Sequence, residues 1–218
     1  MGITGCSLSP GNNTDHSPMI ELPLFPLKTV LLPGNTLSLK VFETRYLDMI
    51  ANCMREDSTF GIILIYRGEE TLSDTDTYSI GTTARISDWQ DRADGLLGVT
   101  ALGLERFEIV STQIKDNGLT LGKVKILEEI IEVDIPEQFF YMQELLNHIS
   151  AQEGKLQNEN QSFSEMMYQL IYLLPLETNL KQRLLEIPNC SDRAVILHAE
   201  LIRLGVIQYV NPAEAQEG

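Results

Sequence analysis

The sequence predicts an α+β protein: a β-rich head, folded as a compact barrel or sandwich, followed by a helical tail. In the first part, short apolar runs are separated by turn residues at the spacing of β-hairpins. After Pro136 the apolar period lengthens from about two residues to about 3.6, which is typical of amphipathic helices. At 218 residues and 43% hydrophobic, the chain has enough apolar material for one large domain or two small ones.

Composition divides the chain into four parts. Residues 1–18 are polar and rich in Gly, Ser, Asn and Pro, so we expect a flexible tail. The β-rich head covers residues 19–134 and the helical part covers residues 135–210. Residues 211–218 form a second expected tail. The candidate functional surface should therefore lie on the two central parts.

Charge and cysteine content restrict the partners and the compartment. A formal net charge of −15 repels a phosphate backbone, which argues against nucleic acid as a partner. No stretch approaches the roughly 20 uncharged apolar residues of a membrane helix. The three cysteines are widely spaced and form no C-x-x-C pair, a pattern that favours reduced thiols and a cytoplasmic setting.

The proline-rich run "ELPLFPLKTVLLPG" (residues 21–34) opens the head. Pro23, Pro26 and Pro33 cannot donate ladder hydrogen bonds, so we expect an edge strand broken by bends. Its inward anchors should be Leu24, Leu27 and Leu31 or Leu32.

The remaining strands follow in order along the head. "TLSLKV" (36–41) alternates apolar and polar residues, as a half-buried strand does. "FGIILIY" (60–66) is continuously apolar and suits a strand covered on both faces. Asp94-Gly95 and Asn117-Gly118 are suited to tight turns. Further strands are expected at 78–87, 96–103, 104–114 and 119–131.

One helix is expected inside the head and four in the tail. The helix at 43–56 should lie over the barrel, with Cys53 as a small buried hydrophobe. Its apolar face comprises Tyr46, Leu47, Ile50, Cys53 and Met54. The tail helices are expected at 137–150, at 163–174 with a Ser162/Glu165 capping box, at 177–187, and at 191–205 with a Ser191 cap.

The search for catalytic chemistry finds no constellation. The chain contains no phosphate loop, no G-x-G-x-x-G and no G-x-S-x-G. His198-Ala199-Glu200 matches part of a zinc-deaminase motif but lacks the P-C-x-x-C that must follow. The loop "DWQDRADG" (88–95) does not have EF-hand spacing and is expected to be a solvated hairpin. We therefore assign no catalytic, metal or cofactor-binding residue.

Four residues are candidates for protein binding. Trp89 and Arg92 are expected at a hairpin tip, where an aromatic residue often marks a contact surface, although Trp89 could instead fold back over the barrel. Phe25 and Phe42 are expected near the barrel rim, with burial in the core as the alternative.

The opening "ELPLFPLKTVLLPGNTLSLKVFETRYLDMI" resembles the start of the amino-terminal domain of Lon proteases, where a proline-punctuated apolar run leads into a strand and then a helix. The resemblance covers Ile20 to Gly205. Its other segments follow in the family order: "YSIGTTARI", "VTALGLERFEI", "LTLGKVKILEE" and "LLPLETNLKQRLLEIPNCSDRAVIL".

This resemblance implies a β-rich, PUA-like pseudo-barrel with a covering helix, followed by a C-terminal α-helical bundle. In Lon proteases the domain helps to recognise and present substrate proteins and holds no catalytic residue. Because the chain ends at Gly218 without an ATPase motif, we expect a stand-alone form. The predicted function is a non-catalytic, ATP-independent module that binds unfolded or apolar polypeptide segments, or that regulates proteolysis.

Three alternatives stay open. An enzyme would need a cleft in which residues such as Glu43, Asp48, Glu105 and Arg106 converge. RNA binding, by analogy with related pseudo-barrels, conflicts with the net charge. Apolar helical stripes could form a homo-oligomer rather than an internal core; the stripe concerned is Met167, Leu170 and Leu174.

Overall fold

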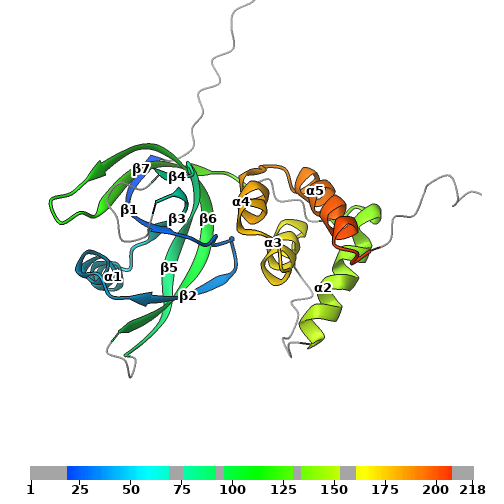
Figure 1. Cartoon of the computed structure of the whole chain (residues 1–218), viewed down its shortest axis with the longest axis horizontal. Coiled ribbons are helices and arrows are strands. Elements are labelled where there is room, and N and C mark those ends of the chain that lie inside the picture. Colours follow the sequence, from blue (N-terminus) through cyan, green and yellow to red (C-terminus); the bar gives the residue numbers. More distant parts are fainter. Residues whose placement is uncertain (1–18, 69–75, 92–95, 130–133, 153–160, 208–218) are drawn as a thin grey trace, which may run out of the picture.

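Strands from both ends of the head meet to close a barrel. In the computed structural model, which describes residues 19–68, 76–91, 96–129, 134–152 and 161–207, the sheet follows the order β1-β7-β6-β5-β3 and closes because β3 also pairs with β1. Figure 1 shows the barrel on one side and helices α2 to α5 on the other. The chain is thus a mixed α+β fold.

The elements run as follows. The strands are β1 (Met19–Leu27), β2 (Thr36–Val41), β3 (Phe60–Arg67), β4 (Asp76–Thr77), β5 (Ile80–Asp91), β6 (Leu97–Ile114) and β7 (Thr120–Leu127). The helices are α1 (Thr44–Glu56), the short 3-10 helix η1 (Glu137–Phe139), α2 (Phe140–Gln152), α3 (Phe163–Leu173), α4 (Thr178–Glu186) and α5 (Cys190–Arg203).

In the described part of the barrel, strand β1 has a free edge along each half, as its prolines predict, but the two halves pair with different strands. Its first half pairs antiparallel with β7 and its second half pairs parallel with β3, so it closes the barrel. A proline fits such a strand where its missing N–H points away from the paired neighbour. Because each half of β1 has a partner on only one side, Pro23 and Pro26 are accommodated. The expected anchors are confirmed, since Leu24, Leu27, Leu31 and Leu32 are all buried.

Strand β6 is one continuous element where two short strands were predicted. It pairs with β2 and β5 over its first part and with β7 over its second part. Gly103 lies between these parts, and a Cβ there would come within 2.5 Å of the Leu32 carbonyl oxygen. The glycine therefore permits the close approach of the β1–β2 connection. The turn predicted at Asn117-Gly118 is confirmed by a φ of 79° at Gly118.

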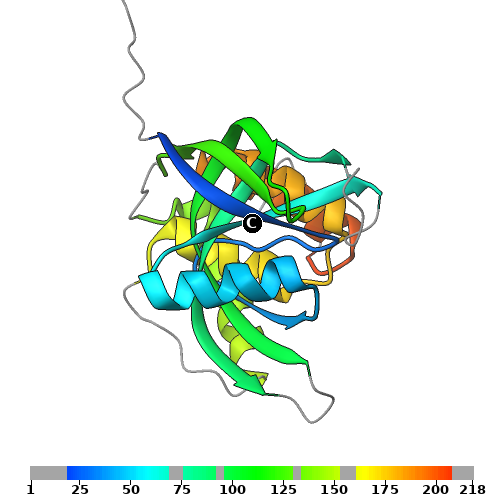
Figure 2. The ribbon, with the colours of Figure 1, turned by 90° about the vertical axis from the view of Figure 1, so that its left-hand side faces the viewer.

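Helix α1 lies across the barrel, as Figure 2 shows. Its buried residues are Tyr46, Met49, Ile50 and Cys53, whereas Met54 is 42% exposed. The predicted apolar face is therefore wrong at one position, because Met49 is buried and Met54 is not. Burial raises the pKa of the Cys53 thiol, opposed by a hydrogen bond with Ser58. This thiol is accordingly a buried hydrophobe and not an activated nucleophile.

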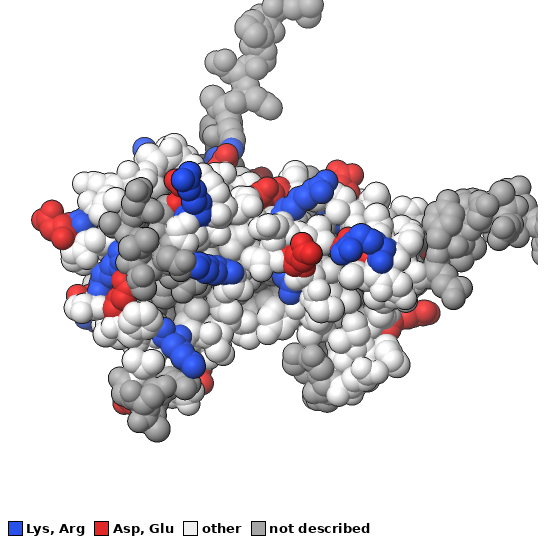
Figure 3. Space-filling view, viewed as in Figure 1, with Lys and Arg blue, Asp and Glu red and all other residues white. Residues whose placement is uncertain are grey.

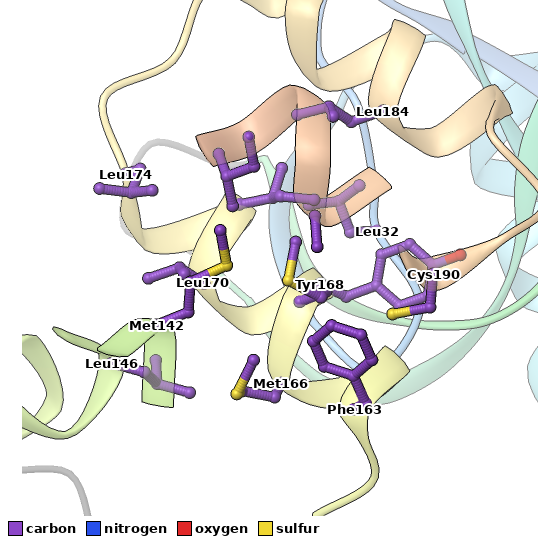
Figure 4. Packing of buried hydrophobic residues seen from close by; sticks show 14 of the residues in the cluster. Leu32, Met142, Leu146, Phe163, Met166, Tyr168, Leu170, Leu174, Leu184 and Cys190 are labelled. Atoms are coloured by element: carbon purple, nitrogen blue, oxygen red, sulfur yellow. The ribbon is translucent and has the colours of Figure 1, made fainter. Parts of the chain in front are cut away.

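Helices α2 to α5 share one hydrophobic cluster, shown in part in Figure 4. Met167, Leu170 and Leu174 belong to this cluster and are buried within the chain, so the stripe packs internally instead of forming a dimer surface. The predicted capping box of Ser162 and Glu165 is confirmed. The cluster also contains Leu32 from the segment after β1, which joins the barrel to the helices.

The cap of α5 differs from the prediction. Asn189, not Ser191, precedes the helix, and its side-chain oxygen accepts a hydrogen bond from the Asp192 N–H at 3.1 Å. Both residue types suit this position, so the sequence pattern alone did not separate them. The N-cap consequently lies two residues earlier than predicted.

A buried charge network links the barrel to the helices. Arg106 of β6 and Arg193 of α5 are almost completely buried, and both form ion pairs with Glu129, at 2.9 and 3.2 Å. Tyr168 donates a hydrogen bond to the same carboxylate at 3.0 Å. Burial raises the pKa of Tyr168, although the charges of Arg193 and Arg106 oppose the shift, so the phenol keeps the proton that it donates.

The two arginines also complete the end of α4. The last carbonyl groups of a helix have no partner within the helix. Arg106 donates to the Leu185 carbonyl at 3.1 Å, and Arg193 donates to the Leu184 and Ile187 carbonyls at 3.0 and 2.8 Å. The end of α4 is therefore satisfied by one residue from the barrel and one from α5.

Replacing Glu129 by Gln should lower the free energy of unfolding by about 3–5 kcal/mol, because two buried guanidinium groups lose their shared counter-charge. Urea unfolding followed by circular dichroism measures this loss. The exposed neighbour Glu128 provides the matched control, since Glu128→Gln should change stability by no more than about 0.5 kcal/mol. Equal effects of the two substitutions would contradict the role of the network.

Candidate functional site

An apolar groove lies between the end of β1, the strand β2 and the start of α1. Its volume is about 330 Å³. Phe25, Leu27 and Thr29 form one wall and residues 37–43 form the other, with Tyr46 of α1 also lining it. We call this the β2 groove. It combines two of the predicted binding residues, Phe25 and Phe42, in one site.

The two phenylalanines have different environments in the β2 groove. Phe25 is buried, and its ring stacks on Tyr46 with a centroid distance of 4.1 Å. Phe42 follows β2 directly and is 59% exposed. Phe25 therefore belongs to the core below the groove, whereas the Phe42 side chain is exposed at its edge.

Two basic residues near the β2 groove, Arg45 and Lys40, differ in their contacts. Arg45 pairs with Glu43 at 2.8 Å, donates to the Gly118 carbonyl at 2.9 Å and lies over the Tyr46 ring. Lys40 is exposed and lines the groove, and no ion pair involves it among the described residues. The groove therefore has one unneutralised cation beside its apolar surface.

Trp89 lies on a neighbouring part of the same surface. The sequence predicted Trp89 at a hairpin tip, but it lies within β5. It pairs with Val99 of β6, and Val99 in turn pairs with Leu39 of β2. At the usual strand spacing, about 10 Å separates the Cα atoms of Trp89 and Leu39. Trp89 is 52% exposed and lines a hollow of about 320 Å³ at the C-terminal end of α1, beside Cys53 and Met54.

The other predicted residues and groups do not add to the β2 groove. Arg92 lies outside the described residues. Lys40 and Tyr46 were not predicted as groove residues. The available signals were the alternation of β2 for Lys40 and the first turn of a predicted helix for Tyr46. Figure 3 shows basic and acidic side chains interspersed on the face it presents.

Of the four residues suggested for an enzyme cleft, Glu43 and Arg106 take part in separate ion pairs. Glu43 pairs with Arg45 at the start of α1, whereas Arg106 pairs with Glu129 beside α4. In the part of the chain that the structure describes, no three His, Cys, Asp or Glu side chains lie close enough to hold a metal ion. The partial deaminase motif is also divided, because His198 contacts Tyr141 and Glu200 pairs with Arg203.

Within the described residues, no helix has the length and apolar character required to cross a membrane.

The fold and the groove together define a class of protein: a closed barrel with an attached helical part and an open apolar surface at one end. The comparison with known families makes this class specific. Residues 21–203 match the ATP-dependent protease La (LON) substrate-binding domain, and the chain belongs to this family.

Individual relatives agree with the family. The Lon protease of Bacillus thuringiensis (strain Al Hakam) is 27% identical over 186 residues, which is 79% of this chain and 23% of that protein. Protein cereblon of Gallus gallus is 29% identical over 112 residues, which is 50% of this chain and 24% of that protein. The chain thus spans about a quarter of the length of these relatives.

Two solved structures share the fold. The crystal structure of a Lon N-terminal domain protein from Xanthomonas campestris has a TM-score of 0.71 and 32% identity, covering 83% of this chain and 98% of that one. The N-terminal domain of Mycobacterium avium complex Lon protease has a TM-score of 0.60 and 17% identity, covering 87% of this chain and all of that one. At that identity the second likeness concerns the fold alone.

Substitution of the two groove phenylalanines by Ala should separate core from surface. Phe25→Ala should cost about 3–5 kcal/mol of unfolding free energy, because it removes a buried ring from its stack on Tyr46. Phe42→Ala should change stability by at most about 0.5 kcal/mol. Urea titration of both variants measures the difference, and a similar loss in both would show that Phe42 is also part of the core.

Proposed function

We propose that the chain is a non-catalytic recognition module that binds unfolded or apolar polypeptide segments in the β2 groove, either as a substrate adaptor or as a regulator of proteolysis. The observation that carries this proposal is the exposed Phe42 above an apolar groove, in a domain of a substrate-binding family. The buried Cys53 thiol, whose pKa is raised by burial, supports a binding role over a catalytic one.

The size of the β2 groove supports a segment as the ligand. A volume of about 330 Å³ accommodates a few side chains, which suits an extended stretch of polypeptide better than a folded surface. Extended apolar stretches are available in unfolded proteins and are buried in folded ones. The proposed selectivity therefore follows from accessibility of the chain and not from one particular sequence.

The β2 groove and the Trp89 hollow are close enough to serve one ligand. Both lie along the strands β2, β6 and β5, at opposite ends of α1. A polypeptide that leaves the β2 groove and crosses β6 can reach Trp89, because the distance from Leu39 is about 10 Å and an extended chain advances about 3.3 Å per residue. We therefore include Trp89 in the proposed binding surface.

Phe42→Ala should weaken the binding of a permanently unfolded protein, such as reduced and alkylated lactalbumin, by about tenfold, which corresponds to about 1.4 kcal/mol. Fluorescence anisotropy of the labelled ligand measures the dissociation constant. Phe140→Ala provides a matched control, because Phe140 is 51% exposed but lies on α2. It should leave the affinity within about twofold.

Trp89 gives an independent readout. It is the only tryptophan of the chain, so its emission should shift to shorter wavelength when a ligand covers it. Equal affinities for the wild type, Phe42→Ala and Phe140→Ala, with no change in Trp89 emission, would count against the proposed function. Native lactalbumin should compete poorly, and equal competition by the native form would also contradict it.

A further inference from the structure

We propose that the ligand of the β2 groove binds as an added β-strand, pairing its backbone with the open edge of β2. The inference rests on the proposed function and specifies the class of ligand: an extended segment with apolar residues at alternate positions and an acidic residue between them. Such strand addition gives affinity through main-chain hydrogen bonds and specificity through alternate side chains.

The outer edge of β2 has no strand partner among the described residues. The whole of β2, from Thr36 to Val41, pairs with β6 and with no other described strand. Just before β2, the Gly103 N–H donates to the Asn35 carbonyl at 2.9 Å, so the carbonyl group of Asn35 points toward β6. Hydrogen-bonded pairs recur at every second residue of an antiparallel ladder.

This alternation assigns the groups of β2 to its two edges. Leu37, Leu39 and Val41 direct their N–H and C=O groups toward β6. Ser38 and Lys40 direct theirs toward the β2 groove, where a second strand would accept and donate. The open edge contains no proline, since the sequence of β2 is "TLSLKV". The strand therefore retains the donors that edge strands often lack.

The opposite wall of the β2 groove, formed by the end of β1, contains a proline and so lacks one backbone donor. The second half of β1 pairs with β3, with Pro26 opposite Ile63. A proline is tolerated in such a ladder when its missing N–H faces away from the partner strand. Pro26 therefore removes a donor from the edge of β1 that faces away from β3. Of the two walls, β2 is the one that can pair fully with an incoming strand.

The side chains along β2 specify the ligand. Leu39 and Val41 are buried and Leu37 is half-buried, so apolar residues of an added strand that lie beside them would enter the β2 groove. The intervening residues would lie beside Ser38 and Lys40, which are exposed. Opposite charges on neighbouring strands attract, and Lys40 has no ion-pair partner among the described residues. An acidic residue at these positions is therefore favoured.

The first test uses wild-type protein and a fluorescent nine-residue peptide with valine at odd positions and glutamate or serine at even positions. Two derivatives carry N-methyl groups on alternate backbone nitrogens, one on the odd residues and one on the even residues. Strand addition requires that one derivative loses at least tenfold in affinity while the other stays within about threefold, because only one set of N–H groups faces β2.

The second test changes the protein. Ser38→Pro removes an N–H from the open edge of β2 and should weaken peptide binding at least tenfold, whereas Ser38→Ala keeps the N–H and should have no more than a twofold effect. Lys40→Glu should weaken binding of the peptide that contains glutamate and strengthen binding of a peptide with lysine in place of glutamate. A thermal melt checks folding of Ser38→Pro; if that variant is unfolded, the N-methyl comparison in wild-type protein decides.

The outcomes separate this inference from the proposed function. Equal losses from both N-methylated peptides, or no binding of the parent peptide, would overturn strand addition. If Phe42→Ala still weakens binding of unfolded lactalbumin, the β2 groove keeps its proposed function without strand pairing. If neither Phe42→Ala nor Ser38→Pro alters any affinity, both proposals are wrong.

Discussion

The position of the helices relative to the barrel depends on Glu129 and the two arginines that it neutralises. Arg106 comes from β6 and Arg193 from α5, and both guanidinium groups are removed from water. Desolvation of such groups is costly, so the network is better understood as a device for specificity than as a source of net stability. If the helices moved away from the barrel, Arg106 would lose its contact with the Leu185 carbonyl at the end of α4, and that carbonyl would lose its donor.

Closure of the barrel and openness of the β2 groove have the same origin. Strand β1 pairs with β7 and then with β3, and this change of partner leaves its second half with a free edge beside the groove. Among the described strands β2 pairs with β6 alone, so its outer edge also stays open beside the groove. Helix α1 covers the barrel core but leaves Phe42 exposed at its start. The groove is therefore a product of topology and does not require a separate insertion.

The elements that sequence predicted best were those with local signals. The alternation of "TLSLKV", the capping box of Ser162 and Glu165, and the turn at Asn117-Gly118 depend on neighbouring residues and were confirmed. The closing role of β1 was missed because its partners lie far along the chain. The charge network was missed for the same reason: no local pattern marks Arg106 and Arg193 as partners of Glu129, and only tertiary packing buries them. Trp89 and Phe42 were predicted as candidates, but their relation through three paired strands became evident only from the register.

The continuity of β6 couples the β2 groove to the helices geometrically. The first residues of this strand pair with β2, and a few residues later the same strand carries Arg106 into the network beneath α4. Although its register with β5 shifts between Gly103 and Arg106, Leu97–Ile114 remains one continuous strand. A polypeptide aligned with β2 would therefore take up a defined orientation relative to α4 and α5. Anything bound to the surface of these helices would then always meet the ligand chain from the same direction.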